Sequence, residues 1–266
     1  MTEREWFVGT SGFMTSRSQW LKLPGLNCIE INSTFYALPT PKIVENWLAL
    51  PSELFFSIKL SRYITHIKRL KKCAKPWKLF WSKIKPLGDR LKAVLIQLPP
   101  SFKNKPETLA RVKAMAAYLP KDGPTIAFEF RSTTWFHSDV YRVMRENGWC
   151  MVGTLLERET SRPWLGDLPF GLHIPMTTSN ATYVRVHGGK GYRGSYSERR
   201  LEAIRKDIVD RKTERNFIMF NNVFFERRGK TCKVDTKRIR YAALCNGVEF
   251  GELVKKGKNK TRKVNR

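Results

Sequence analysis

Acidic residues, histidines, paired cysteines and long apolar runs are all scarce in this chain of 266 residues. Its five cysteines form no C-x-x-C pair, which disfavours a disulfide framework or a cysteine zinc site and suits a reducing compartment. Cys28 and Cys150 lie in apolar segments and are interpreted as core residues. No stretch approaches the roughly 18 apolar residues of a membrane span, and the first residues, MTEREWFVG, lack the apolar region of a signal peptide. We therefore expect a soluble, intracellular protein, cytoplasmic or nucleoid-associated, with no membrane partner.

The glycine-rich loops that bind nucleotide phosphates are absent as well. Gly9 and Gly12 do not complete the pattern G-x-G-x-x-G, and no G-x-x-x-x-G-K-[ST] sequence occurs. The chain has no internal repeat and no sign of a second domain, and its length suits one α/β barrel of about 250 residues. A doubly wound open sheet, which would normally carry such a loop after its first strand, is the alternative fold.

Eight short apolar runs supply the strands of the predicted fold, and most are followed by a segment with helical periodicity. They are FVGT from Phe7, CIEIN from Cys28, FFSIKL from Phe55, AVLIQL from Ala93, IAFEF from Ile126, CMVGTL from Cys150, TYVRVHG from Thr182 and FIMFNN from Phe217. Such near-continuous hydrophobicity is typical of parallel strands that are covered on both faces. The pattern predicts an α/β fold, a single (β/α)8 TIM-like barrel over residues 1–252.

The segments between these runs predict helices at 42–50, 77–87, 106–119, 138–147 and 197–210, the last of them capped by Ser197. A long loop at 157–181 is expected over the barrel mouth. After Asn222 a hairpin or loop is expected, followed by a closing helix from about Asp235.

Positive charge is in large excess, because 50 lysines and arginines against 23 acids leave a formal net charge of +27. Such a surplus attracts polyanions, and DNA or RNA is the expected partner. Part of the surplus lies in a basic C-terminal tail at 253–266 that is predicted to be disordered. Its candidate nucleic-acid-binding residues are Lys255, Lys256, Lys258, Lys260, Arg262, Lys263 and Arg266. The alternative is a solubilising or targeting tail, and the cations of a second basic stretch, 59–92, could simply form the wet face of a helix.

Polar residues stand at the carboxyl ends of the apolar runs, where the active sites of barrels lie. Three pairs are spaced two residues apart, so both members of each point to the same side of their strand. The pairs are Glu30 and Asn32, Glu129 and Arg131, and Arg185 and His187. We expect them to face the barrel mouth together as a candidate active site. The alternative is a polar plug whose charges only pair with one another, although burying so many is costly unless most are paired.

Eight sequence blocks occur in an order that resembles a known family. They are VGTSGF, EINSTFY, K followed by ITH, QLPPSF, EFR followed by WF, YVRVHG, Y-x-G-x-Y and FNN. Over roughly residues 7–222 this set resembles the YecE-like family, domain of unknown function 72, which implies a TIM barrel with the shared residues at its mouth. The matching residues are Glu30, Asn32, Thr34, Tyr36, Lys59, Thr65, His66, Gln97, Glu129, Arg131, Trp135, Arg185, His187, Tyr192, Tyr196, Asn221 and Asn222. The chain departs from the family pattern at Phe13-Met14-Thr15 and in the basic stretch after Asn222.

Candidate roles follow from these positions. The candidate catalytic residues are Glu30, Lys59, Glu129 and His187. The candidate substrate- or phosphate-binding residues are Asn32, Tyr36, His66, Gln97, Arg131, Trp135, Arg185, Tyr192, Asn221 and Asn222. One divalent metal ion is a hypothetical cofactor, with Glu30, His66, Glu129 and His187 as its candidate ligands. Each histidine could equally donate to a backbone carbonyl, and Tyr36 and Trp135 could either stack on a ring at the mouth or pack in the core.

Three functions stay open. The first is a nucleic-acid phosphoesterase or nuclease, by analogy with endonuclease-IV-like barrels, although four histidines argue against a site of three metals. The second is a metal-independent lyase, isomerase or hydrolase on a small sugar-like or phosphorylated substrate, with Glu30 and Glu129 as base and acid and Lys59 as a former of Schiff bases. The alternative for Lys59, which a lone lysine favours, is a structural ion pair with Glu30 or Glu129. The third is a non-catalytic nucleic-acid-binding module.

Overall fold

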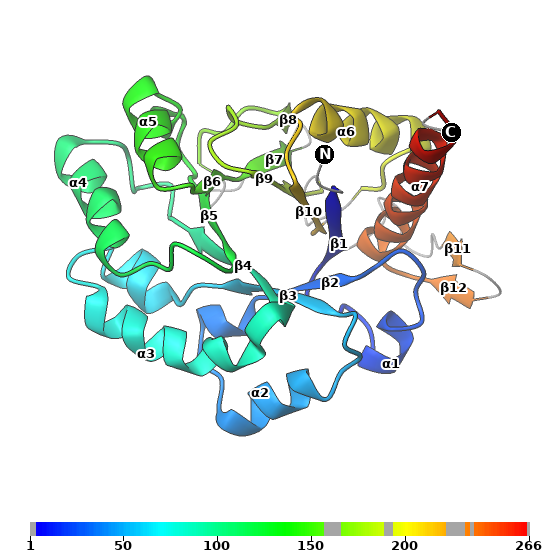
Figure 1. The fold of residues 1–266 in the computed structure, drawn as a ribbon, viewed down its shortest axis with the longest axis horizontal. Coiled ribbons are helices and arrows are strands. Elements are labelled where there is room, and N and C mark those ends of the chain that lie inside the picture. Colours follow the sequence, from blue (N-terminus) through cyan, green and yellow to red (C-terminus); the bar gives the residue numbers. More distant parts are fainter. Residues whose placement is uncertain (1–3, 157–165, 189–193, 222–231, 235–236, 265–266) are drawn as a thin grey trace.

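The computed structural model describes residues 4–156, 166–188, 194–221, 232–234 and 237–264. It is a mixed α/β fold, in which a large curled sheet is surrounded by helices (Figure 1). Among the described residues, no helix has both the length and the apolar character needed to cross a bilayer. Each of the eight predicted apolar runs contains a strand, which confirms the strand pattern that the sequence predicts.

The strands form one ten-stranded sheet in the order β6-β5-β4-β3-β2-β1-β10-β9-β7-β8. Their bounds are β1 Glu5–Ser11, β2 Cys28–Ile31, β3 Phe55–Lys59, β4 Leu91–Gln97, β5 Thr125–Glu129, β6 Cys150–Met151, β7 Gly153–Leu156, β8 Gly171–His173, β9 Ala181–Val186 and β10 Arg215–Phe220. All neighbours pair in parallel except β7 with β8. The last strand of the barrel pattern, β10, pairs with the first, so that Glu5 lies opposite Arg215.

The helices alternate with these strands and cover the outer face of the sheet (Figure 1). They are α1 Arg17–Trp20, α2 Pro41–Leu48, α3 Ala74–Ile84, α4 Pro106–Ala114, α5 Ser138–Glu146, α6 Glu198–Asp210 and α7 Ala242–Val264, with short helical turns η1 Ser33–Phe35, η2 Tyr63–Ile67, η3 Lys85–Arg90, η4 Met115–Ala117 and η5 Thr133–Trp135. The Ser197 side chain accepts a hydrogen bond from the Arg200 backbone N–H, which confirms the predicted cap of α6.

The C-terminal part differs from the prediction. The prediction that the closing helix begins at about Asp235 is wrong. The antiparallel strands β11 Cys232–Val234 and β12 Lys237–Ile239 lie on either side of this position, and α7 begins only at Ala242. Helix α7 continues to Val264, so the predicted boundary between a barrel at 1–252 and a tail at 253–266 falls inside a helix. That boundary and the disorder of the tail stay predictions. The expected long loop at 157–181 contains strand β8.

Two apolar layers follow from the alternation of side chains along each strand. One face of the strands packs against the helices, as Val94, Ile96 and Phe128 do. The opposite face forms an inner cluster whose members recur every second residue. It consists of Phe7, Cys28, Ala93, Leu95, Ala127, Cys150, Val152, Ala181, Tyr183, Phe217 and Met219. The predicted core positions of Cys28 and Cys150 are thereby confirmed. The inner cluster is the apolar layer next to the polar residues at the strand ends.

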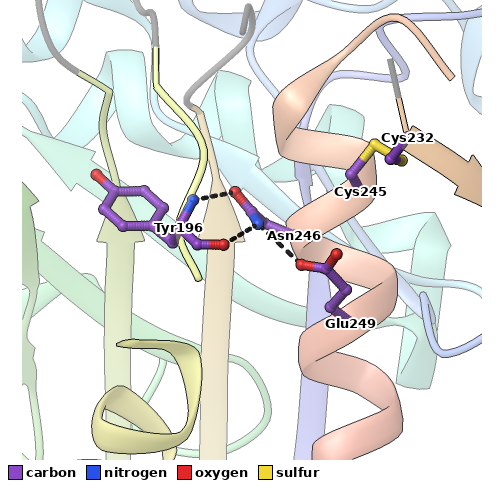
Figure 2. Close-up of a disulfide and its surroundings, with 5 residues drawn as sticks. All are labelled: Tyr196, Cys232, Cys245, Asn246 and Glu249. Atoms are coloured by element: carbon purple, nitrogen blue, oxygen red, sulfur yellow. Dashed lines mark hydrogen bonds between the residues drawn. A yellow bond between two sulfur atoms is a disulfide. The ribbon is translucent and has the colours of Figure 1, made fainter. Parts of the chain in front are cut away.

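A disulfide joins Cys232 of the β11–β12 hairpin to Cys245 of α7, thirteen residues further along the chain (Figure 2). The sequence disfavoured a disulfide framework, and this single link departs from that expectation. The expectation rested on the odd number of cysteines and on the missing C-x-x-C pair, whereas the turn between β12 and α7 brings two distant cysteines together. The link fastens the hairpin to the first turns of α7.

Candidate functional site

Three charged side chains lie on the same face of the strands as the inner cluster, each two residues closer to the carboxyl end of its strand. Glu30 follows Cys28 by two residues, Glu129 follows Ala127, and Arg185 follows Tyr183, so each points inward. Glu30 and Glu129 are completely buried, and Arg185 keeps 3% of its surface. The expectation that residues from distant strands meet inside the curl at the carboxyl ends is confirmed for these three by their direct contacts.

Arg185 is the centre of the buried charges. Its Nε and Nη2 donate to Oε2 and Oε1 of Glu30 at 3.0 and 2.7 Å, which is a bidentate pair. Its Nη1 donates to Glu129 Oε2 at 2.9 Å. Burial opposes the charged guanidinium, but Glu129 and Glu30 outweigh it and raise the pKa of Arg185. Arg131 forms an ion pair with the other oxygen of Glu129, so two arginines balance two carboxylates.

Glu30 is held as a carboxylate by several donors. Besides Arg185, Ser11 Oγ donates to it at 2.7 Å, the Tyr183 hydroxyl at 2.8 Å and Asn32 Nδ2 at 3.2 Å. Burial alone would raise the pKa of Glu30, but Arg185 and these hydrogen bonds lower it to about 2. The proposed role of Glu30 as a catalytic acid or base does not suit a carboxylate that stays ionised and so fully engaged. Its geometry instead suits the positioning of Arg185.

Lys59, at the end of β3, differs from the other charged residues of the site. Its Nζ lies 4.2 Å from the centre of the Phe35 ring, and no carboxylate among the described residues forms an ion pair with it. Burial, followed by the charge of Arg185, lowers the pKa of Lys59 to about 8, against the opposing effects of Glu129 and Glu30. This amine therefore loses its proton far more easily than an ordinary lysine does.

The two candidate histidines lie at different places on the rim. His66 is in the turn η2, where its Nδ1 lies 2.9 Å from Thr65 Oγ1. Burial, and then the charges of Lys59 and Arg62, lower the pKa of His66 to about 4, so it is neutral at neutral pH. His187 is buried after β9 with Nδ1 3.3 Å from Asn221 Nδ2.

The suggested metal ligands Glu30, His66, Glu129 and His187 do not form a common set in the structure. Within the described ranges, no group of three or more histidine, cysteine, aspartate or glutamate side chains is placed to hold a metal ion. The physical reason is visible in the contacts of the carboxylates, whose oxygens are engaged by Arg185 and Arg131. The hypothesis of a single metal bound by these four residues is therefore not supported.

Several other candidate binding residues can be placed. Asn32 borders Glu30, and Gln97 lies opposite Glu129 in the β4–β5 register. Tyr36 is 73% exposed beside the site. Trp135 is a core residue rather than a stacking surface at the mouth, because it is fully buried between Phe102 and Phe130.

The remaining candidates are only partly covered by the described structure. Tyr192, Asn222 and Arg266 lie outside the described residues. Lys255 and Lys256 are exposed on α7. Lys258, Lys260, Arg262 and Lys263 belong to the same helix, but their side chains are not described.

A loop segment rests against the end of β5. The Asp167 carboxylate accepts from the Thr133 backbone N–H at 2.7 Å and from Ser132 Oγ at 3.2 Å. Gly166 has a φ of +70°, and a Cβ there would lie 1.7 Å from the Arg131 carbonyl oxygen. Only glycine fits such an approach, so this turn lies directly on the backbone of a site residue.

Helix α7 also reaches the site, through contacts that sequence analysis missed (Figure 2). Asn246, next to the disulfide, accepts from the Tyr196 backbone N–H at 3.0 Å and donates to the Tyr196 carbonyl at 2.9 Å. The Tyr196 hydroxyl in turn donates to the His187 carbonyl at 2.5 Å. A polar Asn within the apolar run AALCNGVEF was the one available signal.

Ser57 and Tyr183 are further site residues that were not predicted. The Tyr183 hydroxyl, which donates to Glu30, lies 2.8 Å from Ser57 Oγ. Both residues stand inside apolar strands, where a tyrosine or serine has no feature that distinguishes it from a core residue.

Comparisons with known proteins agree with this architecture. A family model described as "Protein of unknown function DUF72" matches residues 18–232. The UPF0759 protein YecE of Escherichia coli (strain K12) is 35% identical over 77 residues, which are 29% of this chain and only 28% of that protein. A crystal structure of a DUF72 family protein from Thermotoga maritima MSB8 is 25% identical, with a TM-score of 0.73 over 95% of this chain and 100% of that chain. A second crystal structure, of a DUF72 family protein from Enterococcus faecalis V583, is 18% identical and shares the fold. The match covers 96% of this chain and 99% of that chain, with a TM-score of 0.73.

Proposed function

This chain belongs to the DUF72 family, and from the geometry of its strand-end cluster we propose that the cluster is an active site in which the amine of Lys59 is the reactive group. The proposed activity is that of a metal-independent lyase or isomerase. Its substrate is a small sugar-like or phosphorylated compound with a carbonyl group. The observation that carries the proposal is the position of Lys59, a partly buried amine without an ion pair among the described residues, beside carboxylates that are already paired with arginines.

Two further features support a site for a polar ligand. Within the described part of the chain, Asn32 Oδ1 and Thr154 Oγ1 are buried polar atoms without a hydrogen-bond partner. Asn32 is already in contact with Glu30, and Thr154 lies opposite Arg185 in the β7–β9 register. Buried polar atoms normally find a partner, and the hydroxyls of a sugar-like substrate would supply donors to both.

The chemistry requires only groups of this chain. The neutral Lys59 amine attacks the carbonyl carbon, its nitrogen loses protons, and the carbonyl oxygen leaves as water, which gives an imine. Arg185 and Arg131 stay charged and favour the loss of the Lys59 proton. Glu129 is completely buried between Arg185 and Arg131, so, like Glu30, it positions these guanidinium groups, and the protons of this step are exchanged with water.

Reductive trapping tests the proposal. Incubation with glyceraldehyde 3-phosphate, ribose 5-phosphate or dihydroxyacetone phosphate and cyanoborohydride should add to Lys59 the mass of the compound less one oxygen atom, as measured by peptide mass spectrometry. Lys59→Met should lose at least about nine-tenths of the total adduct. Lys78→Met, which removes an exposed lysine of α3, serves as the matched control and should lose little. Adducts spread over surface lysines, with Lys59 no more reactive than Lys78, would overturn the proposal.

The pH dependence of Lys59 gives a second test. Because burial and Arg185 disfavour its charged form, the neutral amine forms as the pH rises through about 8, whereas a model lysine requires a pH of about 10.4. Competitive acetylation with a trace of acetic anhydride, at a series of pH values, should therefore give a midpoint near 8 for Lys59. Free Nα-acetyl-lysine in the same tube is the reference. Equal midpoints for the two amines would contradict a perturbed Lys59.

We also infer that the sheet closes into an eight-stranded (β/α)8 barrel. The support is the segment Cys150–Leu156, in which β6 pairs with β5 while β7, one residue later, pairs with β9. The Val152 N–H donates to the Phe128 carbonyl and the His187 N–H to the Leu155 carbonyl, each at 2.9 Å. A segment bonded on both edges joins the two ends of a parallel sheet, and the sheet then has no free parallel edge.

A second candidate function is the binding of DNA or RNA, favoured by one specific observation. Residues 54–88 contain ten lysines and arginines and no acid, six of these cations are exposed, and exposed cations of this kind attract phosphates. We retain this function as a non-catalytic one, because the observation that favours it is a set of cations that bind phosphates without any chemical step. A cytoplasmic or nucleoid-associated location stays a prediction.

A further inference from the structure

We propose that single-stranded nucleic acid docks on a surface that borders the site and is formed by Tyr36 together with part of residues 54–88. This surface, which we name the η2 rim, consists of the exposed residues Tyr36, Arg62, Tyr63, Ile67, Lys71 and Lys72 together with the half-buried Lys68. The proposal rests on the second candidate function and adds the place and the form of the partner.

The η2 rim is continuous with the candidate site. The Phe35 ring contacts the Tyr36 ring at 5.0 Å and the His66 ring at 4.9 Å, in both cases edge to face. Phe35 also lies beneath Lys59 Nζ. From His66 the turn η2 leads directly to Tyr63, whose ring lies 5.9 Å from Lys68 Nζ. A strand bound along this rim would therefore pass beside the mouth.

The charges of the η2 rim are not neutralised within the described structure. No carboxylate there forms an ion pair with Arg62, Lys68, Lys71 or Lys72. The lowered pKa of His66, which burial and then surrounding cations produce, is a sign of the same positive potential. Phosphates are the natural counter-charge for uncompensated lysines and arginines on one face.

The loop that carries these cations is held in a fixed and uncommon conformation. Arg69, Leu70 and Lys72 have φ values of 49°, 61° and 51°, a region that side-chain-bearing residues rarely adopt. The buried Leu70 side chain and a 3.1 Å bond from its N–H to the Ile64 carbonyl hold the loop in place. Strain that the surrounding fold maintains is often found at binding sites, because it positions groups before the ligand arrives.

The side chains of the η2 rim favour unpaired over paired bases. Tyr36 and Tyr63 are 73% and 47% exposed, and exposed rings bind single strands by stacking on bases. A duplex hides its base faces and is recognised by an element that enters a groove. The five-residue turn η2 has no such shape.

Fluorescence anisotropy with a labelled oligothymidine of about 12 nucleotides tests the inference. Lys71→Gln with Lys72→Gln should weaken binding about tenfold at moderate salt and lower the slope of log K against log salt by roughly 1.4. The control pair Lys121→Gln with Lys206→Gln removes two exposed lysines elsewhere and should change affinity less than about twofold. Tyr36→Ala should weaken binding by about fivefold or more, whereas Phe170→Ala, a 58% exposed aromatic control, should not.

The outcomes are distinguishable. Equal losses of affinity from the two lysine pairs would mean that binding depends only on overall charge. That result would overturn the η2 rim as the binding surface. Tighter binding of a duplex of the same length, unaffected by Tyr36→Ala, would overturn the preference for single strands. If the wild-type protein binds neither, the second candidate function itself fails. Thermal unfolding of every variant, followed by circular dichroism, verifies that each one is folded.

Discussion

Replacement of Arg185 by methionine is expected to lower the free energy of unfolding by about 3 to 5 kcal/mol. Arg185 makes three charged hydrogen bonds to two completely buried carboxylates, Glu30 and Glu129. Without the guanidinium, Glu30 loses its only cationic partner among the described residues, and a buried carboxylate without a counter-charge is strongly disfavoured. Urea denaturation at neutral pH, followed by circular dichroism, measures the change.

Two variants separate the broken pair from simple loss of packing. Glu30→Gln combined with Arg185→Met removes both charges and should recover most of the stability, because a neutral replacement of a buried pair costs little. Arg142→Met removes an arginine from an exposed pair with Asp139 and should cost less than about 1 kcal/mol. A double variant as unstable as Arg185→Met alone would show that the ion pair is not the cause.

Gly9→Ala is expected to destabilise the fold by about 3 kcal/mol. A Cβ at Gly9 would lie 1.7 Å from the carbonyl oxygen of Cys28, its register partner in β2. Since the obstacle is backbone rather than a mobile side chain, β1 and β2 have to move apart. Their separation would also disturb the contact between Ser11 and Glu30, which are paired two residues further along. The loss is measured as a shift of the urea midpoint.

Gly12→Ala is the matched control for that variant. Gly12 has a φ of +86°, but a Cβ there would meet no atom within 4 Å. Its substitution should therefore cost only the backbone strain, about 1 kcal/mol. If Gly9→Ala is no more harmful than Gly12→Ala, the close approach of the two strands is not essential.

Much of the fold could be predicted because its strands are buried on both faces. Runs such as AVLIQL and FIMFNN begin with several consecutive apolar residues, and a polar residue near their end is a visible break in the pattern. The same break located Glu30, Glu129 and Arg185, whose two-residue spacing from neighbouring polar residues showed that they share a face. Periodicity therefore carried the information about both the strands and the centre of the site.

The remaining features depend on contacts between distant segments, which periodicity does not record. That the carboxylates pair with arginines rather than with a metal depends on the register of β2, β5 and β9. Trp135 could not be distinguished from a ligand-stacking ring until Phe102 and Phe130 were found on either side of it. The link between Cys232 and Cys245 likewise requires a hairpin whose strands are only three residues long.

The pairing of β1 with β10 has a consequence for folding during synthesis on the ribosome. Strand β1 is synthesised before its neighbour on one side, Arg215–Phe220, which emerges only after some two hundred more residues have been added. Until then one edge of β1 exposes unpaired amides and carbonyls, which is the state most prone to aggregation. Completion of the sheet must wait for this long loop to close, and contacts so far apart in sequence make folding slow.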